Sequence, residues 1–417
     1  MTTTRLPLLL LSLLFCTLLV VSRRPDVLFH ATFWAEDGWS WYPDAYLRGW
    51  HVLVEPWTGY MQTDVRLVAF VSQLFPLAWA PTLFACSAIL LQAVTATFML
   101  SDRLAEICPS RPYRALFALF YMLLPNSFEV YANLTNAQWH LGLLAFLVTI
   151  AANPRSRAQL VFDVVALGIS VLSGPFCLFL IPIALIRTAL ERDRIAAMRT
   201  AIIVAGALVQ LWCLFGHGLS RSAPPLGAGP RRLAVILSMQ VILPVLLGRH
   251  STPIYTTLGW WRDDILPCLV ALAGLALTVR TLIVGPAIVR WACLFAGGQL
   301  FAALVRPATG SQTPAWVLFS MPDVGDRYYI LPMLAWAVVL FALTADPSRA
   351  FRRCGQCLML LMLIMLPGDW HLPTSFPFTG RTDFVQRAHA FAEAPSGTVM
   401  SFPVHPAGMR PMWLTKR

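Results

Sequence analysis

The chain is poor in charged residues. Asp, Glu, Lys and Arg together make up 12% of its 417 residues, whereas 58% are hydrophobic. A soluble domain carries about twice that share of charge, so the composition excludes an ordinary soluble protein. Several apolar runs approach the ~20 residues that an α-helix needs to cross the ~30 Å hydrocarbon core of a bilayer. The sequence therefore predicts an all-α, polytopic membrane protein.

Lysine is almost absent, since Lys416 is the only one. The formal net charge of +11 therefore comes from arginine, which suits a GC-rich bacterial genome and cytoplasmic loops that set membrane topology. These arginines are scattered between apolar segments. Binding to nucleic acid needs a concentrated basic face, so we expect no nucleic-acid partner.

The cysteines do not indicate a redox site. Most of the nine lie inside apolar runs, where cysteine behaves as a small hydrophobic residue. Cys354 and Cys357 form a CxxC motif, but no thioredoxin-like strand and helix surround it. We interpret this motif as part of an apolar helix.

Hydropathy predicts about eleven membrane-spanning helices within residues 1–367. We expect the N-terminus in the cytoplasm and the first helix retained as a signal anchor, because Arg23, Arg24 and Pro25 form a poor cleavage context. Long outer loops are expected at about 23–64 and 217–264, and a short external tail at 368–417. The predicted spans are about 6–22, 81–100, 115–125, 138–152, 159–173, 176–188, 200–216, 265–283, 286–304, 328–345 and 356–367.

The positions of the arginines support this topology. Each of the four loops expected on the cytoplasmic side carries several arginines, as the positive-inside rule requires; these loops are 101–114, 153–158, 187–199 and 346–355. Two apolar stretches, 65–79 and 233–247, are expected to lie along the membrane surface. Arginines in the second outer loop can meet a specific anionic lipid phosphate or ordinary phospholipid head groups, and both interpretations stay open; these are Arg221, Arg231, Arg232, Arg249 and Arg262.

An acidic and aromatic stretch at residues 33–42 follows the first predicted helix. Carboxylates near a bilayer are costly and tend to be kept where a cavity or a substrate uses them. We therefore predict Asp37 and Glu36 as catalytic: one deprotonates a hydroxyl and the other orients it or binds a metal. Asp37 is favoured because Gly38 permits close approach, and Trp34 is predicted to stack on a sugar ring. The alternative is a solvated acid that caps the next helix.

Two arginines are candidate ligands for phosphate. Arg66 can pair with an acid of the first loop, bind a phosphate through its planar guanidinium, or be an ordinary interfacial arginine. Arg327 opens a predicted helix beside Tyr328. A cation at a helix N-terminus is unfavourable unless an anion lies nearby, so we predict that Arg327 binds phosphate and that Tyr328 belongs to the same site. The competing interpretation is an ion pair of Arg327 with Asp323 or Asp326.

The expected turn at 129–140 is rich in polar side chains. Glu129, Asn133, Asn136 and Trp139 are predicted to contact a substrate, with the amides hydrogen-bonding to sugar hydroxyls. The same amides can instead cap the ends of the helical hairpin. His140 is a further candidate, although a histidine at a helix end is more often satisfied within the fold than used as a base.

The order of these features resembles the GT-C class of membrane glycosyltransferases, which have a first helix, an acidic outer loop and then short helices with brief outer turns. Two strings are similar to ones in uncharacterised bacterial members, Trp34 to Gly38 and Arg327 to Pro332. The turn at Ser173-Gly174-Pro175 resembles a Lys-Gly-Pro turn of that class, with Ser173 where the lysine would be.

The resemblance implies transfer of a sugar from a polyprenyl-phosphate carrier at the outer leaflet of the bacterial inner membrane, with an acid of the first outer loop activating the acceptor. The donor lipid and membrane lipids are thus the expected partners. No cofactor is firmly indicated, although adjacent carboxylates can bind a divalent metal. Without the lysine, Arg327 or Arg66 would have to hold the donor phosphate.

Two other functions stay open. A transporter or flippase of lipid-linked sugars typically shows internal repeats and ionisable groups in mid-membrane; Asp163 is the only clear acid within a predicted span, and no repeat is visible. A polysaccharide polymerase or ligase is expected to place paired arginines in a large outer loop, which Arg231, Arg232 and Arg249 partly satisfy. The acidic first loop favours the transferase.

Overall fold

The computed structural model describes residues 5–216, 225–251, 265–307, 313–371 and 382–417. The described chain is almost entirely helical, as expected. Its longer helices are α1 (Arg5–Arg23), α5 (Ala80–Leu100), α6 (Arg111–Met122), α7 (Gln138–Ile150), α8 (Arg157–Val171), α9 (Phe176–Glu191), α10 (Arg194–Gly216), α15 (Ile265–Val284), α16 (Ala287–Val305), α18 (Ile330–Leu343) and α19 (Arg349–Met365).

Local sequence signals set where several of these helices begin. The hydroxyl of Ser110 accepts a hydrogen bond from the Tyr113 backbone N–H at the start of α6, and Ser156 does the same for Gln159 at the start of α8. Such side chains satisfy N–H groups that have no partner within the helix. After each N-terminal cap, a run of mainly apolar residues continues the helix.

Seven described helical segments are long and apolar enough to cross a membrane, so the chain is a multi-pass membrane protein. They are Leu77–Leu100, Arg194–Gly216, Pro230–His250, Ile265–Val284, Ala287–Val305, Asp326–Leu343 and Arg349–Asp369. The expected count of about eleven spans is not confirmed. Several predicted spans are shorter helices: α6 has 12 residues, and at 1.5 Å per residue such a helix covers only about 18 Å.

The stretch at 233–247 differs from the prediction. Instead of a surface segment within an outer loop, Pro230–His250 is a helical segment that could span the membrane. It consists of α11 (Pro230–Ile236), a π-helical turn and α12 (Leu243–Leu247). Pro244 does not interrupt it, because it lies in the first turn of α12, where a missing N–H costs little. Arg221 and Arg262 lie outside the described residues.

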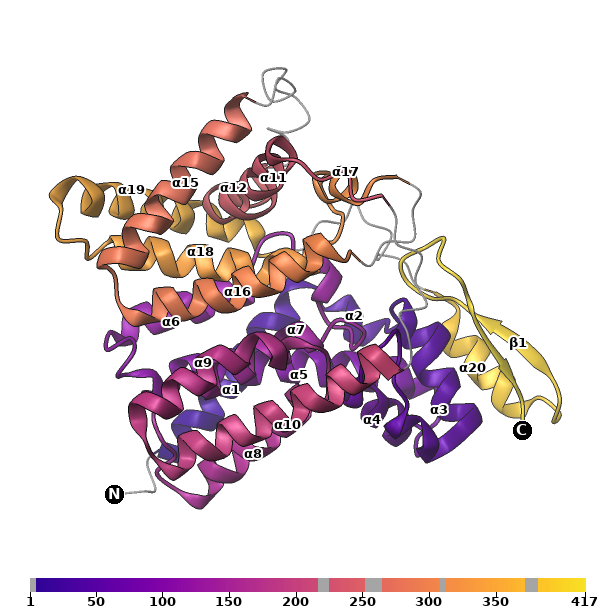
Figure 1. The fold of residues 1–417 in the computed structure, drawn as a ribbon. Coiled ribbons are helices and arrows are strands. Elements are labelled where there is room, and N and C mark those ends of the chain that lie inside the picture. Colours follow the sequence, from indigo (N-terminus) through magenta and orange to yellow (C-terminus); the bar gives the residue numbers. More distant parts are fainter. Residues whose placement is uncertain (1–4, 217–224, 252–264, 308–312, 372–381) are drawn as a thin grey trace.

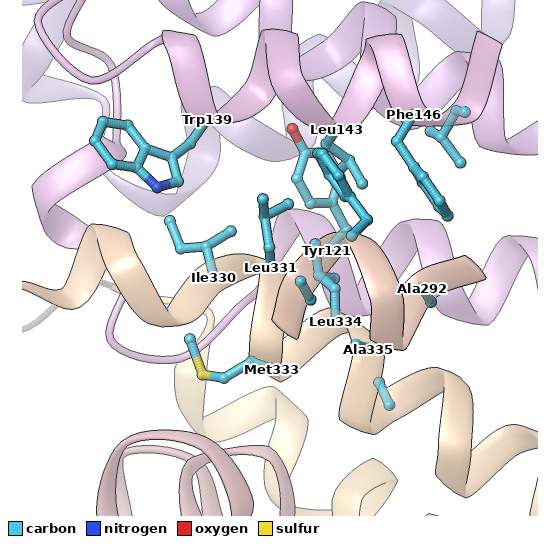
Figure 2. Packing of buried hydrophobic residues seen from close by; sticks show 14 of the residues in the cluster. Tyr121, Trp139, Leu143, Phe146, Ala292, Ile330, Leu331, Met333, Leu334 and Ala335 are labelled. Atoms are coloured by element: carbon cyan, nitrogen blue, oxygen red, sulfur yellow. The ribbon is translucent and has the colours of Figure 1, made fainter. Parts of the chain in front are cut away.

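The helices form two groups that face each other (Figure 1). One group contains α1 and α5–α10, with α6 packed chiefly against α5, and the other contains α15, α16, α18 and α19. Figure 2 shows apolar side chains of α7 and α18 between the two groups; those labelled are Trp139, Leu143, Phe146, Ile330, Leu331, Leu334 and Ala335. Because lipid tails are as apolar as these side chains, close van der Waals packing contributes most to such contacts in a membrane.

One end of the bundle collects the predicted cytoplasmic loops. The buried carboxylate of Asp163 accepts hydrogen bonds from Arg103 at 2.6 and 2.8 Å and from Arg199 at 2.8 Å. Arg103 also donates to the carbonyl of Ala152. The loops that begin near Arg103, Ala152 and Glu191 are therefore at the same end, as the arginine distribution predicts.

The opposite end carries the first loop and the end of the chain (Figure 1). The first loop contains α2 (Asp26–Phe29), α3 (Tyr42–Arg48) and α4 (Thr63–Ser72). Residues 382–417 contribute α20 (Phe384–Glu393) and an antiparallel hairpin, β1 (Val399–Phe402) with β2 (Met412–Thr415), in which Val399 pairs with Thr415. Their backbone joins the first loop, because Ala35 N–H donates to the His405 carbonyl at 2.6 Å and His405 N–H donates to the Phe33 carbonyl at 2.8 Å.

Candidate functional site

Three segments that are distant in sequence meet at this end of the bundle. They are the acidic loop at 33–42, the turn at 123–137 between α6 and α7, and the short α17 (Ala315–Phe319) with the residues that lead into α18. The acidic loop contains a π-helical turn, Asp37–Trp41, a geometry that is rare and often found at functional sites. Hydrogen bonds and an ion pair between these segments define the candidate site.

Asp37 joins the acidic loop to the α6–α7 turn. Its carboxylate, 1% exposed, accepts hydrogen bonds from the Leu134 N–H at 3.0 Å and from both the N–H and the hydroxyl of Thr135 at 2.8 Å. The Trp41 indole N–H also donates to the Thr135 hydroxyl. Burial raises the pKa of Asp37 to about 8, although these hydrogen bonds oppose the shift. Asp37 thus holds the backbone of the α6–α7 turn against the acidic loop.

Glu36 is free for other contacts. Its side chain is half-buried, and it forms no hydrogen bond or ion pair with the described part of the chain. Its carboxylate and the phenol of Tyr60 lie within electrostatic range of Arg327. Glu36 is therefore the acid of this loop that a substrate could reach.

Gly38 permits a close approach, but to the chain's own C-terminal segment. A Cβ atom at this position would lie 2.6 Å from a methyl carbon of Val404 and 2.9 Å from Cβ of Phe33. Any larger residue would therefore push residues 399–415 away from the acidic loop. Trp34 lies half-buried in the same contact, where it forms a β-bridge with His405.

Arg327 pairs with Glu129, and not with Asp323 or Asp326. The Arg327 guanidinium forms an ion pair with one Glu129 oxygen, and the Arg327 backbone N–H donates to the other at 3.0 Å. The guanidinium carbon lies 4.7 Å from the ring centre of Tyr328 and 6.0 Å from that of Trp139, within the range of cation–π attraction. The side chain of Arg327 is still 23% exposed, so an anionic ligand can reach it.

The two asparagines shape the turn from within. The Asn133 amide N–H donates to the Glu129 carbonyl at 2.9 Å, and that of Asn136 donates to the same carbonyl at 2.7 Å. The Asn133 side-chain oxygen accepts from the Asn136 backbone N–H. Both side chains are buried. They therefore hold the backbone of Glu129 in place, and the structure does not direct them to a ligand.

The contacts of His140 and Arg66 are with residues other than Glu129 and Arg327. The two ring nitrogens of His140 contact the Tyr121 hydroxyl at 2.7 Å and the Val130 carbonyl at 3.2 Å, so this histidine is satisfied within the bundle. Arg66 is 1% exposed and stacks over Trp41 at 5.1 Å. Its guanidinium lies 3.7 Å from Asp44.

The Ser173 turn docks against the first loop, which the sequence did not reveal. Gln62 forms an antiparallel β-bridge with Ser173, the Asp64 N–H donates to the Ser173 hydroxyl at 3.0 Å, and the Gly174 N–H donates to the Met61 carbonyl at 3.0 Å. Ser173 therefore positions the segment that precedes Arg66. The turn that resembles the Lys-Gly-Pro motif thus lies beside the candidate site.

Several buried oxygen atoms near these segments have no hydrogen-bond partner in the described chain. They belong to Gln62, Asp64, Gln138 and Asp326. Burial raises the pKa of Asp64 to about 6. Oxygen acceptors buried without a donor are costly, and hydroxyl groups of a ligand are suitable donors. Sequence reasoning named none of these four as site residues, because isolated Gln and Asp residues give no distinctive pattern.

The described residues contain no group of three His, Cys, Asp or Glu side chains that could hold a metal ion. Comparison with known proteins assigns no relative either: no family model matches the chain, and no curated protein matches it.

Proposed function

We propose that this protein is a membrane glycosyltransferase of the GT-C type, which moves a sugar from a polyprenyl-phosphate carrier to an acceptor at the outer face of the bacterial inner membrane. The main support is the position of Glu36: this acid, which has no partner among the described residues, lies within electrostatic range of Arg327, whose side chain is only partly buried. Transfer of a sugar from a phosphate-linked donor requires a base and a cation that binds the phosphate, both at the same membrane boundary.

In this proposal Arg327 binds the carrier phosphate. Glu129 uses Nη1 of the guanidinium and Nη2 makes a long contact of 3.4 Å with the Tyr328 hydroxyl, so the N–H groups left over can bind the phosphate oxygens. Tyr328 and Trp139 enclose the guanidinium from its faces. Glu129 therefore orients the arginine, and the aromatic rings keep it from rotating into solvent.

Glu36 acts as the general base. It takes the proton from the acceptor hydroxyl as the hydroxyl oxygen bonds to the anomeric carbon of the sugar. The bond from that carbon to the phosphate oxygen breaks, and its electron pair leaves on the polyprenyl phosphate, where Arg327 stabilises the charge. The acceptor atoms of Gln62, Asp64 and Gln138 are suited to hold sugar hydroxyls.

Asp37 has a positioning role in this scheme. Its oxygens already accept three hydrogen bonds from Leu134 and Thr135, and the side chain is 1% exposed, so they are not placed to take a proton from an acceptor. The sequence favoured Asp37 over Glu36, whereas the contacts of the two residues favour Glu36.

A flippase has less support. Asp163, the one clear acid within a predicted span, is held by Arg103 and Arg199, so it is not available to couple transport to an ion. A polymerase or ligase would use the same carrier and differ in the acceptor, and it remains the second candidate.

The proposal is tested with purified protein in liposomes that contain a radiolabelled polyprenyl-phosphate sugar and a membrane extract as acceptor. A transferase removes the label from the carrier and leaves polyprenyl phosphate. A flippase leaves the label on the carrier but exposes it on the other leaflet. A ligase acts on carrier that bears a long glycan and leaves the monosaccharide donor intact. Either of the last two results would overturn the proposal.

A further inference from the structure

A large apolar cavity lies between the helices and reaches the end of the bundle opposite Glu36 and Arg327. Its volume is about 460 Å³, within the ~300–1,000 Å³ typical of ligand pockets. Helices α6, α7, α16 and α18 surround the cavity. One end of the cavity is at Leu331, in the first turn of α18. The other end is at Pro109, an exposed residue in the loop before α6. Its walls include Leu147, Phe295 and Val338.

One charged residue lines this cavity. Arg114 is 4% exposed, and its Nε and Nη1 atoms have no hydrogen-bond partner in the described chain. Among the described residues, its one ion pair is with Asp102 at 3.3 Å, a carboxylate that it shares with Arg111. One acid between two arginines leaves a positive charge at the wall of an apolar cavity, and a buried cation is stable only when an anion pairs with it.

The start of α6 adds to this positive charge. Arg111 and Arg114 lie in its first turn, which contains no acidic residue. The N-terminus of a helix carries a partial positive charge, so two arginines there are unfavourable unless an anion is nearby. A phosphate group would offset the helix dipole and accept hydrogen bonds from Nε and Nη1 of Arg114, which have no partner in the described chain.

We propose that this cavity binds an anionic membrane phospholipid, whose acyl chain fills the apolar space and whose phosphate pairs with Arg114. By the arginine distribution this end faces the cytoplasmic leaflet, where anionic lipids attract basic residues. The acyl chain of the lipid would contact α6, α16 and α18 at once, and so would hold together helices that are distant in sequence. Arg114 lies at the opposite end of the bundle from Arg327, so the proposal does not depend on the transfer function.

The test measures lipid retention by native mass spectrometry of the purified full-length chain. Phosphatidylglycerol and phosphatidylcholine are titrated separately. We expect phosphatidylglycerol to bind more tightly, and the Arg114→Gln variant to weaken its binding by about tenfold, as expected for loss of one charge-assisted contact. Arg111→Gln is the matched control, because that side chain lies on the same turn, is 78% exposed and does not line the cavity.

A second variant tests the cavity itself. Ala335→Phe places a ring in the apolar space between α7 and α18 (Figure 2), so it should reduce retention of phosphatidylglycerol while thermal melting still shows folded protein. Equal effects of Arg114→Gln and Arg111→Gln, or equal binding of the two lipids, would refute the proposal. If polyprenyl phosphate displaces phosphatidylglycerol at equal concentration, the occupant is the carrier and the phospholipid assignment is wrong.

Discussion

Arg327 and Glu129 are 198 residues apart in sequence and form an ion pair that joins the start of α18 to the turn between α6 and α7. The backbone N–H of Arg327 donates to the same carboxylate, so Glu129 fixes both the side chain and the first turn of the helix. The pair thereby connects the two groups of helices at the end where the acidic first loop lies.

Replacement of Arg327 by lysine should affect donor binding more than chemistry. Lysine keeps the charge but loses the planar guanidinium that can contact Glu129 and a phosphate together. We expect KM for the polyprenyl-phosphate sugar to rise by about tenfold, with a smaller fall in kcat. Steady-state kinetics in liposomes measures both.

Arg48→Lys provides the matched control for that experiment. Arg48 lies in the first loop, is 44% exposed, and pairs with Asp44 and Glu55, and surface pairs of this kind contribute little. Its kinetics should match the wild type. If Arg327→Lys lowers kcat and leaves KM unchanged, Arg327 acts in the chemical step and not in donor binding.

Asp37 should make stability depend on pH. In the folded protein its carboxyl keeps its proton up to a pKa of about 8, whereas the ordinary value for aspartate is 3.8. Between these values the unfolded chain binds fewer protons, so a rising pH favours unfolding. The apparent Tm of the wild type should therefore fall, relative to that of Asp37→Asn, between about pH 5 and pH 8. Parallel curves for the two proteins would contradict the shift.

The Asp163 network should stabilise the opposite end of the bundle. Asp163 is fully buried and holds Arg103 and Arg199. Replacement by alanine leaves two buried guanidinium groups without their carboxylate, a change that typically costs about 3–5 kcal/mol. Chemical unfolding in mixed micelles measures the loss. Glu106→Gln, at an exposed position of the 101–114 loop, should unfold like the wild type; a similar stability for Asp163→Ala would mean that the network contributes nothing.

Cysteine labelling tests which end faces the cytoplasm. Ala158 and Ala407 are exposed at opposite ends, and each can be replaced by cysteine in a background where the exposed Cys86 and Cys357 are serine. A membrane-impermeant maleimide applied to intact cells should label Ala407→Cys and leave Ala158→Cys unlabelled. The reverse pattern would show that the arginine distribution was misinterpreted.

The sequence located most helices well, because apolar runs and their polar boundaries are local properties. The span expected at 81–100 is α5, Ala80–Leu100, and that expected at 286–304 is α16, Ala287–Val305. The number of full crossings is not confirmed, because several of the predicted spans, such as the 12-residue α6, are too short to cross a bilayer. The stretch at 233–247, expected to lie along the membrane surface, forms part of the helical segment Pro230–His250, which is long and apolar enough to span the membrane.

The candidate site was harder to predict, because its contacts are made between distant segments. The sequence indicated Glu36, Asp37, Glu129 and Arg327 individually from their charge near a membrane boundary. It could not show that Glu129 is the partner of Arg327. Nor could it show that Asn133 and Asn136 are engaged by a backbone carbonyl, since such hydrogen bonds form only once the turn is folded.

The most direct test of the account is sugar transfer by Glu36→Gln in liposomes with a labelled polyprenyl-phosphate sugar. Glutamine keeps the size of the side chain but cannot accept a proton, and loss of a general base typically costs about 10²–10⁴-fold in rate. Glu55→Gln, in the same loop, should retain full activity because Glu55 forms a half-exposed pair with Arg48. The account predicts a loss of this size for Glu36→Gln with normal folding and donor binding. Turnover of Glu36→Gln at the wild-type rate would contradict it.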